Sequence, residues 1–163
     1  AAGLDVYRTL NGELKLACVA DTGVGSWFYE LEGPFQFGRS LHGRTGMRGQ
    51  PFAGSPNFVL THRGVRPNGL FASLHVGFSN TVSGGIPLPF DLAVYGFDES
   101  QVLVSLDLNG PLVPQAANGD FQFAMPTLPL NLRGVTLHFQ WLVFDPNVPF
   151  GLAMSKGGKT LIY

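Results

Sequence analysis

Residues 134–146 read GVTLHFQWLVFDP and present more apolar surface than any other segment of the chain. Between the turn glycine and the closing Asp-Pro, apolar side chains recur at every second position: Val135, Leu137, Phe139, Trp141 and Val143. This period of two predicts a long β-strand with one buried face. The last two alternate positions, Leu142 and Phe144, are apolar as well. We therefore expect this end of the strand to be covered on both faces, as in the centre of a sandwich.

The composition narrows the class of protein. Of the 163 residues, 45% are hydrophobic and only 13% are charged, so the chain can fold around a sizeable core. Its 22 Gly, 12 Pro and 14 Phe are typical of short strands joined by tight turns. The net charge of -1 argues against a nucleic-acid partner, and no apolar run is long enough to cross a bilayer.

Two further features concern the compartment. The sequence begins with Ala1-Ala2, as mature secreted proteins do after signal-peptide cleavage, so we expect an extracellular or cell-surface protein. An artificially trimmed chain would begin in the same way. Cys18 is the only cysteine, which excludes a disulfide within the chain. We expect it to be a small core residue, with a bond between two chains as the alternative.

Alternating segments recur along the chain. We expect strands at 4–10 and 13–20, joined by an Asn11-Gly12 hairpin turn, and at 27–31, 34–38, 58–62, 70–78, 102–108, 121–125, 134–146, 152–154 and 160–163. A turn is expected at 156–159. The fold class is therefore all-β: an antiparallel β-sandwich of roughly ten short strands, with Greek-key or jelly-roll connections as one option.

The domain organisation is expected to be one β-sandwich spanning 1–163. N-terminal strands occupy 1–38, and the main portion of the sandwich occupies 57–163. Between them, residues 39–56 lose all periodicity and are rich in Gly, Pro and Arg, which predicts a long loop.

From about Asn57 onward, an ordered set of motifs resembles the C-terminal β-sandwich domains of large secreted proteins from planctomycetes, myxobacteria and related bacteria. The set comprises residues 86–92 (IPLPFDL), 139–141 (FQW), 143–146 (VFDP) and 151–155 (GLAMS). Where such domains commonly carry Gly-Cys, this chain has 97–100 (FDES). The resemblance implies a secreted bacterial sandwich, and it carries over no catalytic residue.

No catalytic, cofactor or metal site is expected. Ser40 and His42 lack the spacing of a nucleophile elbow. His75 and His138 would be neighbours if their strands pair, but we expect two half-exposed surface histidines. Glu30 and Glu32 beside aromatic residues could describe a sugar groove, although outward Glu more often keeps a strand edge soluble.

Arginines are concentrated in one stretch. Between Glu32 and Asp91 there is no acidic residue, whereas five arginines fall inside it: Arg39, Arg44, Arg48, Arg63 and Arg66. Such a basic patch could bind an anionic glycan or the acidic surface of an identical neighbour. Arginines scattered over a polar loop are equally compatible with no partner.

Two hypotheses for function follow. The first is a structural subunit of an extracellular assembly, a homo-oligomer or polymer joined by strand pairing and outward aromatics. The second is a carbohydrate-binding or accessory module of the bacterial cell surface. The candidate interface residues are Leu4, Val6, Tyr7 and Leu10 in a terminal strand, the arginines Arg39, Arg44 and Arg48, and the aromatics Phe71 and Phe144. The alternative for the terminal strand is pairing with 14–19 of its own chain.

Overall fold

The computed structural model describes residues 2–8, 14–21, 26–30, 35–40, 42–63, 71–97, 100–117 and 119–163. Within these ranges the protein is all-β, with sixteen strands and three short 3-10 helices, which confirms the predicted class. There are more strands than the roughly ten expected because four have only two residues. The chain divides into two compact units, Ala1–Gly33 and Pro34–Tyr163.

The first unit is a three-stranded antiparallel sheet of β1 (Ala2–Arg8), β2 (Leu14–Asp21) and β3 (Ser26–Glu30), in that order. Leu4 lies opposite Cys18, and Val6 lies opposite Leu16. The expected hairpin pairing is thus made within the chain, and the Asn11-Gly12 turn itself lies outside the described residues. In this sheet β1 and β3 are the two edge strands.

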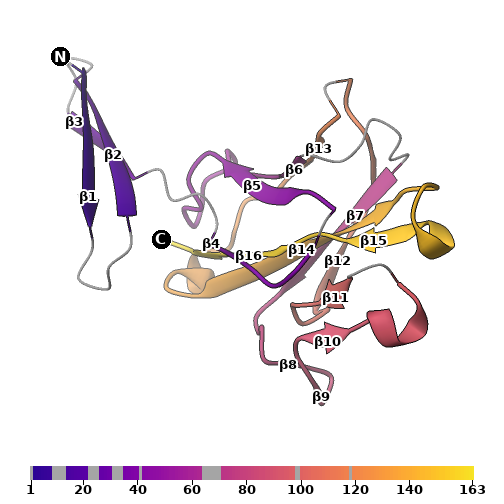
Figure 1. Cartoon of the computed structure of the whole chain (residues 1–163). Coiled ribbons are helices and arrows are strands. Elements are labelled where there is room, and N and C mark those ends of the chain that lie inside the picture. The colour runs from indigo at the N-terminus through magenta and orange to yellow at the C-terminus, as the bar shows by residue number, and fades with distance from the viewer. Residues whose placement is uncertain are drawn as a thin grey trace. The chain divides into compact units, whose positions relative to one another are not determined.

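The second unit contains two sheets that face each other (Figure 1). The large sheet has the order β12-β7-β14-β16-β4, with β15 also paired to β14. Its strands are β4 (Phe35–Phe37), β7 (Phe71–Gly77), β12 (Leu108–Pro114), β14 (Thr136–Phe144), β15 (Leu152–Met154) and β16 (Gly157–Leu161). The small sheet has the order β13-β6-β5, formed by β5 (Arg44–Arg48), β6 (Val59–Arg63) and β13 (Phe121–Ala124).

The core fills the space between these two sheets. Trp141 of β14 is completely buried, and its ring centroid lies 6.4 Å from that of Phe121 on the small sheet. Buried side chains from both layers complete the cluster, among them Phe58, Leu60, Ala72, Leu74, Leu137, Phe139 and Val143. The predicted sandwich is therefore present, and the predicted central strand is its central strand.

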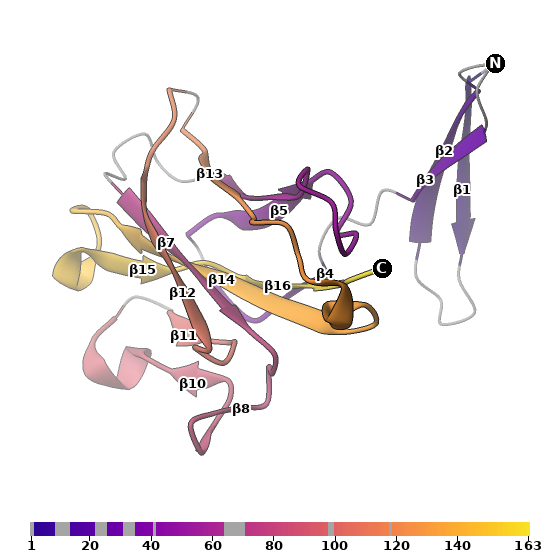
Figure 2. The ribbon, with the colours of Figure 1, turned by 180° about the vertical axis from the view of Figure 1, so that it is seen from behind.

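A third layer covers the other face of the large sheet (Figures 1 and 2). It comprises β8 (Val82–Ser83), β9 (Ile86–Pro87), β10 (Phe90–Asp91), the 3-10 helix η1 (Ala93–Tyr95) and β11 (Gln101–Val102). The completely buried Gln140 anchors it. The Gln140 Oε1 atom accepts a hydrogen bond from the Leu103 N–H (2.9 Å), and Nε2 donates to the carbonyls of Gln101 (2.7 Å) and Ser155 (2.8 Å).

The coverage of β14 differs from the prediction. We expected its second face to be buried at the C-terminal end, at Leu142 and Phe144. Instead that face is buried at Gln140 and His138, whereas Leu142 and Phe144 are only half-buried. The reason is that a polar amide can fix a crossing backbone through hydrogen bonds, which apolar side chains cannot do.

Residues 39–56 are not one long loop, because they contain β5. The sequence of β5 does not show the usual alternation of apolar and polar side chains. The inward side of β5 carries a polar residue, Thr45, and on the outward side a Cβ at Gly46 would lie 2.6 Å from the Thr61 Oγ1 atom. Likewise β4, which we grouped with the N-terminal strands, pairs with β16 of the second unit.

Two other expectations were wrong. The strand predicted at 102–108 ends after Val102, because the next backbone groups bond to Gln140 and to the Ser79 carbonyl instead of a neighbouring strand. The glycines of the predicted turn at 156–159 lie inside β16. A Cβ at Gly158 would lie 2.6 Å from the Phe139 ring, so glycine serves close approach here and not turning.

The remaining 3-10 helices are η2 (Leu130–Leu132) and η3 (Pro149–Gly151), which lie in the connections on either side of β14. The Gly134 N–H after η2 donates to the Ile162 carbonyl, and the Asp145 N–H before η3 donates to the Gly151 carbonyl. Both connections are thus tied back to the sheet that they flank.

Replacing Trp141 with alanine should lower the free energy of unfolding by about 3–5 kcal/mol, since this is the usual cost of truncating a buried aromatic residue. Urea unfolding followed by circular dichroism measures the change. A loss below about 1 kcal/mol would contradict the central position of Trp141 in the core.

Replacing Gln140 with leucine should cost several kcal/mol, because the Leu103 N–H and the Gln101 and Ser155 carbonyls lose this partner at about 1–3 kcal/mol for each group left unsatisfied. The matched control is Gln122→Leu, on the exposed side of β13, which should change stability by less than about 0.5 kcal/mol. Equal losses for the two variants would show that Gln140 does not anchor the third layer.

Candidate functional site

The first candidate surface lies on the outer face of the large sheet. In the strand register, Phe144 is opposite Phe71, Pro114 flanks Phe71 on the other side, and Leu152 flanks Phe144. We call these four side chains the aromatic row. Phe71 is 46% exposed, and Phe144 and Leu152 are half-buried. The two predicted aromatics are thus brought side by side.

A parallel row widens this surface. Leu112, Ser73 and Leu142 are opposite one another on the adjacent register positions of the same face, and Leu112 is 58% exposed. The part of the same face around Gln140 is covered by the third layer. Contiguous apolar surface of this kind commonly marks an interaction site.

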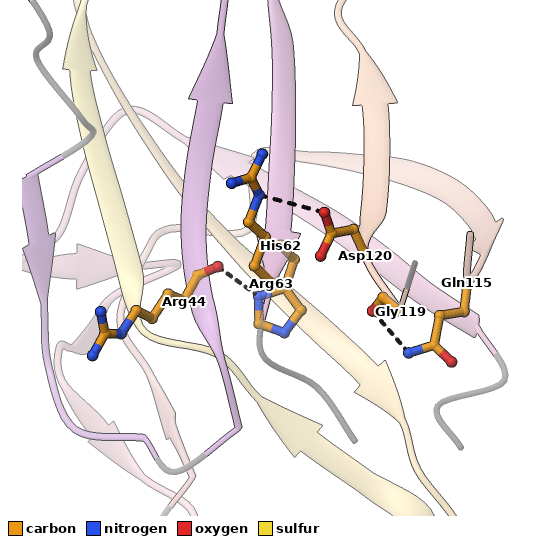
Figure 3. A network of polar contacts seen from close by, with 6 residues as sticks. All are labelled: Arg44, His62, Arg63, Gln115, Gly119 and Asp120. Carbon is orange, nitrogen blue, oxygen red and sulfur yellow. Dashed lines mark hydrogen bonds and ion pairs between the residues drawn. The ribbon is translucent and has the colours of Figure 1, made fainter. Parts of the chain in front are cut away.

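The second candidate surface lies on the outer face of the small sheet. Arg44 and Arg48 are on the same side of β5, and Arg63 of β6 is directly opposite Arg44. We call these three residues the arginine face. The Arg63 Nε atom lies 3.4 Å from the Asp120 Oδ2 atom (Figure 3). The side-chain amide of Gln115 donates to the Gly119 carbonyl (2.9 Å) in the turn before Asp120.

The other predicted interface residues fall elsewhere. Arg39 lies outside both sheets, where its backbone N–H donates to the Gln101 Oε1 atom (3.3 Å). Leu4, Val6 and Tyr7 lie in β1, paired with β2, while Leu10 and Arg66 are outside the described residues.

Sequence reasoning missed Leu112, Pro114 and Leu152 as members of the apolar surface. It placed the strand at 102–108, one segment before β12, so the outward positions of β12 were not assigned. The apolar run 112–114 (LVP) was the sequence feature that could have indicated a strand here. The exposed aromatic side chains of Tyr95 and Phe150 were not predicted either. They lie in the short helices η1 and η3, which show no repeating pattern of apolar residues in the sequence.

The residues weighed for chemistry have other partners. The Ser40 hydroxyl donates to the Met154 carbonyl (2.6 Å) and accepts from the His42 backbone N–H (2.9 Å). His75 is opposite Gln140 and His138 is opposite Gly77, so both histidines do lie on one face of paired strands. Among the residues that the structure describes, no group of three or more His, Cys, Asp or Glu could hold a metal ion. Over the same ranges, none of the helices has the length and apolar character to cross a membrane.

Within the described ranges of the chain, three ionisable groups have shifted pKa values. Burial lowers the pKa of His62 to about 4, although its hydrogen bonds to the backbone act to raise it. Burial, and then the charge of Lys159, lower the pKa of His138. Hydrogen bonds from the Ser105 hydroxyl and the Phe78 N–H lower the pKa of the exposed Asp107 carboxyl.

His62 lies directly beneath the arginine face. Its ring is completely buried and nearly parallel to those of Phe121 and Trp141, at centroid distances of 6.2 and 6.1 Å. Its Nδ1 atom lies 3.2 Å from the Arg44 carbonyl oxygen, which accepts a hydrogen bond when Nδ1 carries the proton (Figure 3). A neutral imidazole in the core therefore holds the backbone from which Arg44 projects.

The lowered pKa of His62 predicts that stability falls on acidification. Between pH 6.5 and about 4 the unfolded chain binds a proton that the folded chain does not, so the free energy of unfolding decreases as the pH falls. At roughly 1.4 kcal/mol per pKa unit, the loss is about 3 kcal/mol and is complete near pH 4. Urea unfolding at pH 7 and pH 4.5 measures it.

The variant His62→Phe should flatten this dependence, while His75→Gln, which changes a partly exposed histidine, should preserve it. His138 contributes with the same sign, and Asp107 acts only below its usual pKa of 3.8, outside this window. If His62→Phe keeps the full slope of the wild-type protein, His62 is not the group responsible.

Comparison of the chain with protein-family models, with curated proteins and with solved structures found no match.

Proposed function

We propose that this chain is a non-catalytic structural subunit of an extracellular assembly, such as a fibre, a sheath or a surface layer. The aromatic row is the observation that carries the proposal. It leaves Phe71 and Leu112 about half exposed, side by side on the outer face of the large sheet. Burying such surface against a second copy would contribute about 25 cal/mol for each Å² removed from water.

The edge strands support the same proposal. In the second unit the four edge strands of the two facing sheets are short or protected against pairing: β12 contains Pro111, Pro114 and a register shift, β4 has three residues, β13 has four, and β5 carries Arg44 and Arg48. In the first unit, β1 is a seven-residue edge strand without proline. It is the edge best suited to pair with a strand of a neighbouring subunit.

The extracellular setting is taken from the resemblance of residues 57–163 to secreted bacterial sandwich domains. A carbohydrate-binding or accessory module of the bacterial cell surface is the second candidate. The specific observation that favours it is the arginine face, since guanidinium groups pair well with the carboxylates and sulfates of anionic glycans.

Sedimentation velocity over a range of protein concentrations tests self-association. The wild-type protein should form oligomers or polymers, which negative-stain microscopy would show as ordered particles. The double variant Phe71→Ser/Leu112→Ser should shift the distribution to smaller species, because it removes apolar contact area from the exposed row.

The matched control is Leu130→Ser, which removes a leucine that is 70% exposed on η2, away from the aromatic row. It should leave association unchanged. A wild-type protein that stays monomeric at its highest soluble concentration would refute the proposal. If both variants reduced association equally, the aromatic row would not be the surface that mediates self-association.

A further inference from the structure

The arginine face concentrates positive charge on three neighbouring positions. Directly opposite residues of antiparallel strands have Cα atoms only about 4.5–5.5 Å apart, so Arg44 and Arg63 form a like-charge cross-strand pair. Such pairs destabilise a sheet unless an anion is nearby. The sequence carries no acidic residue between Glu32 and Asp91 that could provide one from these two strands.

Neutralisation of this face is incomplete. Asp120 is 3.4 Å from Arg63, whose side chain still remains 55% exposed. Arg44 and Arg48 are exposed and have no ion pair in the part of the chain that the structure describes. Two of the three guanidinium groups are therefore open to an external anion.

The guanidinium groups do not converge on one point. Figure 3 shows the Arg44 and Arg63 side chains pointing in different directions. Arg44 and Arg48 are four residues apart on one strand, which separates their Cα atoms by roughly 13 Å. A single small anion cannot reach all three groups, whereas a linear polymer with repeated anionic groups can.

We propose that the arginine face binds an acidic polysaccharide through its sulfate or carboxylate groups. The residues on the same side of the small sheet as the arginines are Gly46, Val59, Thr61, Gln122 and Ala124, of which Thr61 is buried. None of these is aromatic, so the face offers no stacking platform for the bases of single-stranded nucleic acid. This inference rests on the second candidate function and is independent of self-association.

Affinity measurements with the full chain test the inference. The probes are heparin, which carries sulfate groups, polygalacturonate, which carries only carboxylates, uncharged dextran, and poly(dT) as a single-stranded nucleic acid. At low ionic strength we expect binding to heparin, to polygalacturonate or to both, and none to dextran or poly(dT). Which acidic polymer binds identifies the anionic group, and added NaCl should weaken that binding by screening.

The double variant Arg44→Gln/Arg48→Gln should raise the dissociation constant for the acidic polymer by about tenfold or more, because two charge-assisted contacts are lost. The control Arg39→Gln/Arg133→Gln removes the same net charge from exposed arginines outside the small sheet and should bind as the wild-type protein does. The series is repeated in the Phe71→Ser/Leu112→Ser background, so that a failure of self-association is distinguished from a failure of binding.

Several results would overturn the inference. These are the absence of binding to both acidic polymers, equal weakening by the two arginine double variants, and comparable affinity for poly(dT). If Arg44→Gln/Arg48→Gln leaves polysaccharide binding intact and instead dissociates oligomers, the arginine face is an interface between copies of the chain.

Discussion

The second unit depends on two adjacent residues of β14 that point to opposite sides of the large sheet. Trp141 fills the space between the two sheets, and its neighbour Gln140 binds the backbone of the covering layer through both ends of its amide. Ser155 joins the two, because its carbonyl accepts from Gln140 and its N–H donates to the Trp141 carbonyl. Apolar packing on one side and a satisfied amide on the other thus fix all three layers to one strand.

This arrangement divides the outer face of the large sheet into a covered and an open part. Near Gln140 and His138 the polar residues are buried under the third layer or against Phe37. Beyond them, Leu142 and Phe144 offer no hydrogen bond to a crossing backbone, and the covering ends. No segment of the described chain covers the apolar side chains there. These exposed side chains form the aromatic row.

The two candidate surfaces lie on outer faces of opposing sheets, so they point away from each other across the core. One surface is apolar, and the other is cationic. His62 lies between them, holding the Arg44 carbonyl while it stacks on Trp141, so the cationic surface shares its support with the core.

The sequence by itself determined the all-β class, the N-terminal hairpin and the central strand, because period-two alternation and Asn-Gly turns act over a few neighbouring residues. It also identified Phe71 and Phe144 as outward-facing, and it named Arg44 and Arg48 as candidate interface residues, although it placed both arginines in a loop. Only the tertiary structure decided that Phe71 lies opposite Phe144, that Arg44 lies opposite Arg63, that Gly157 and Gly158 lie within a strand, and that Gln140 is buried. These depend on strand register and on backbone that crosses from far along the chain, and no local pattern encodes either of them.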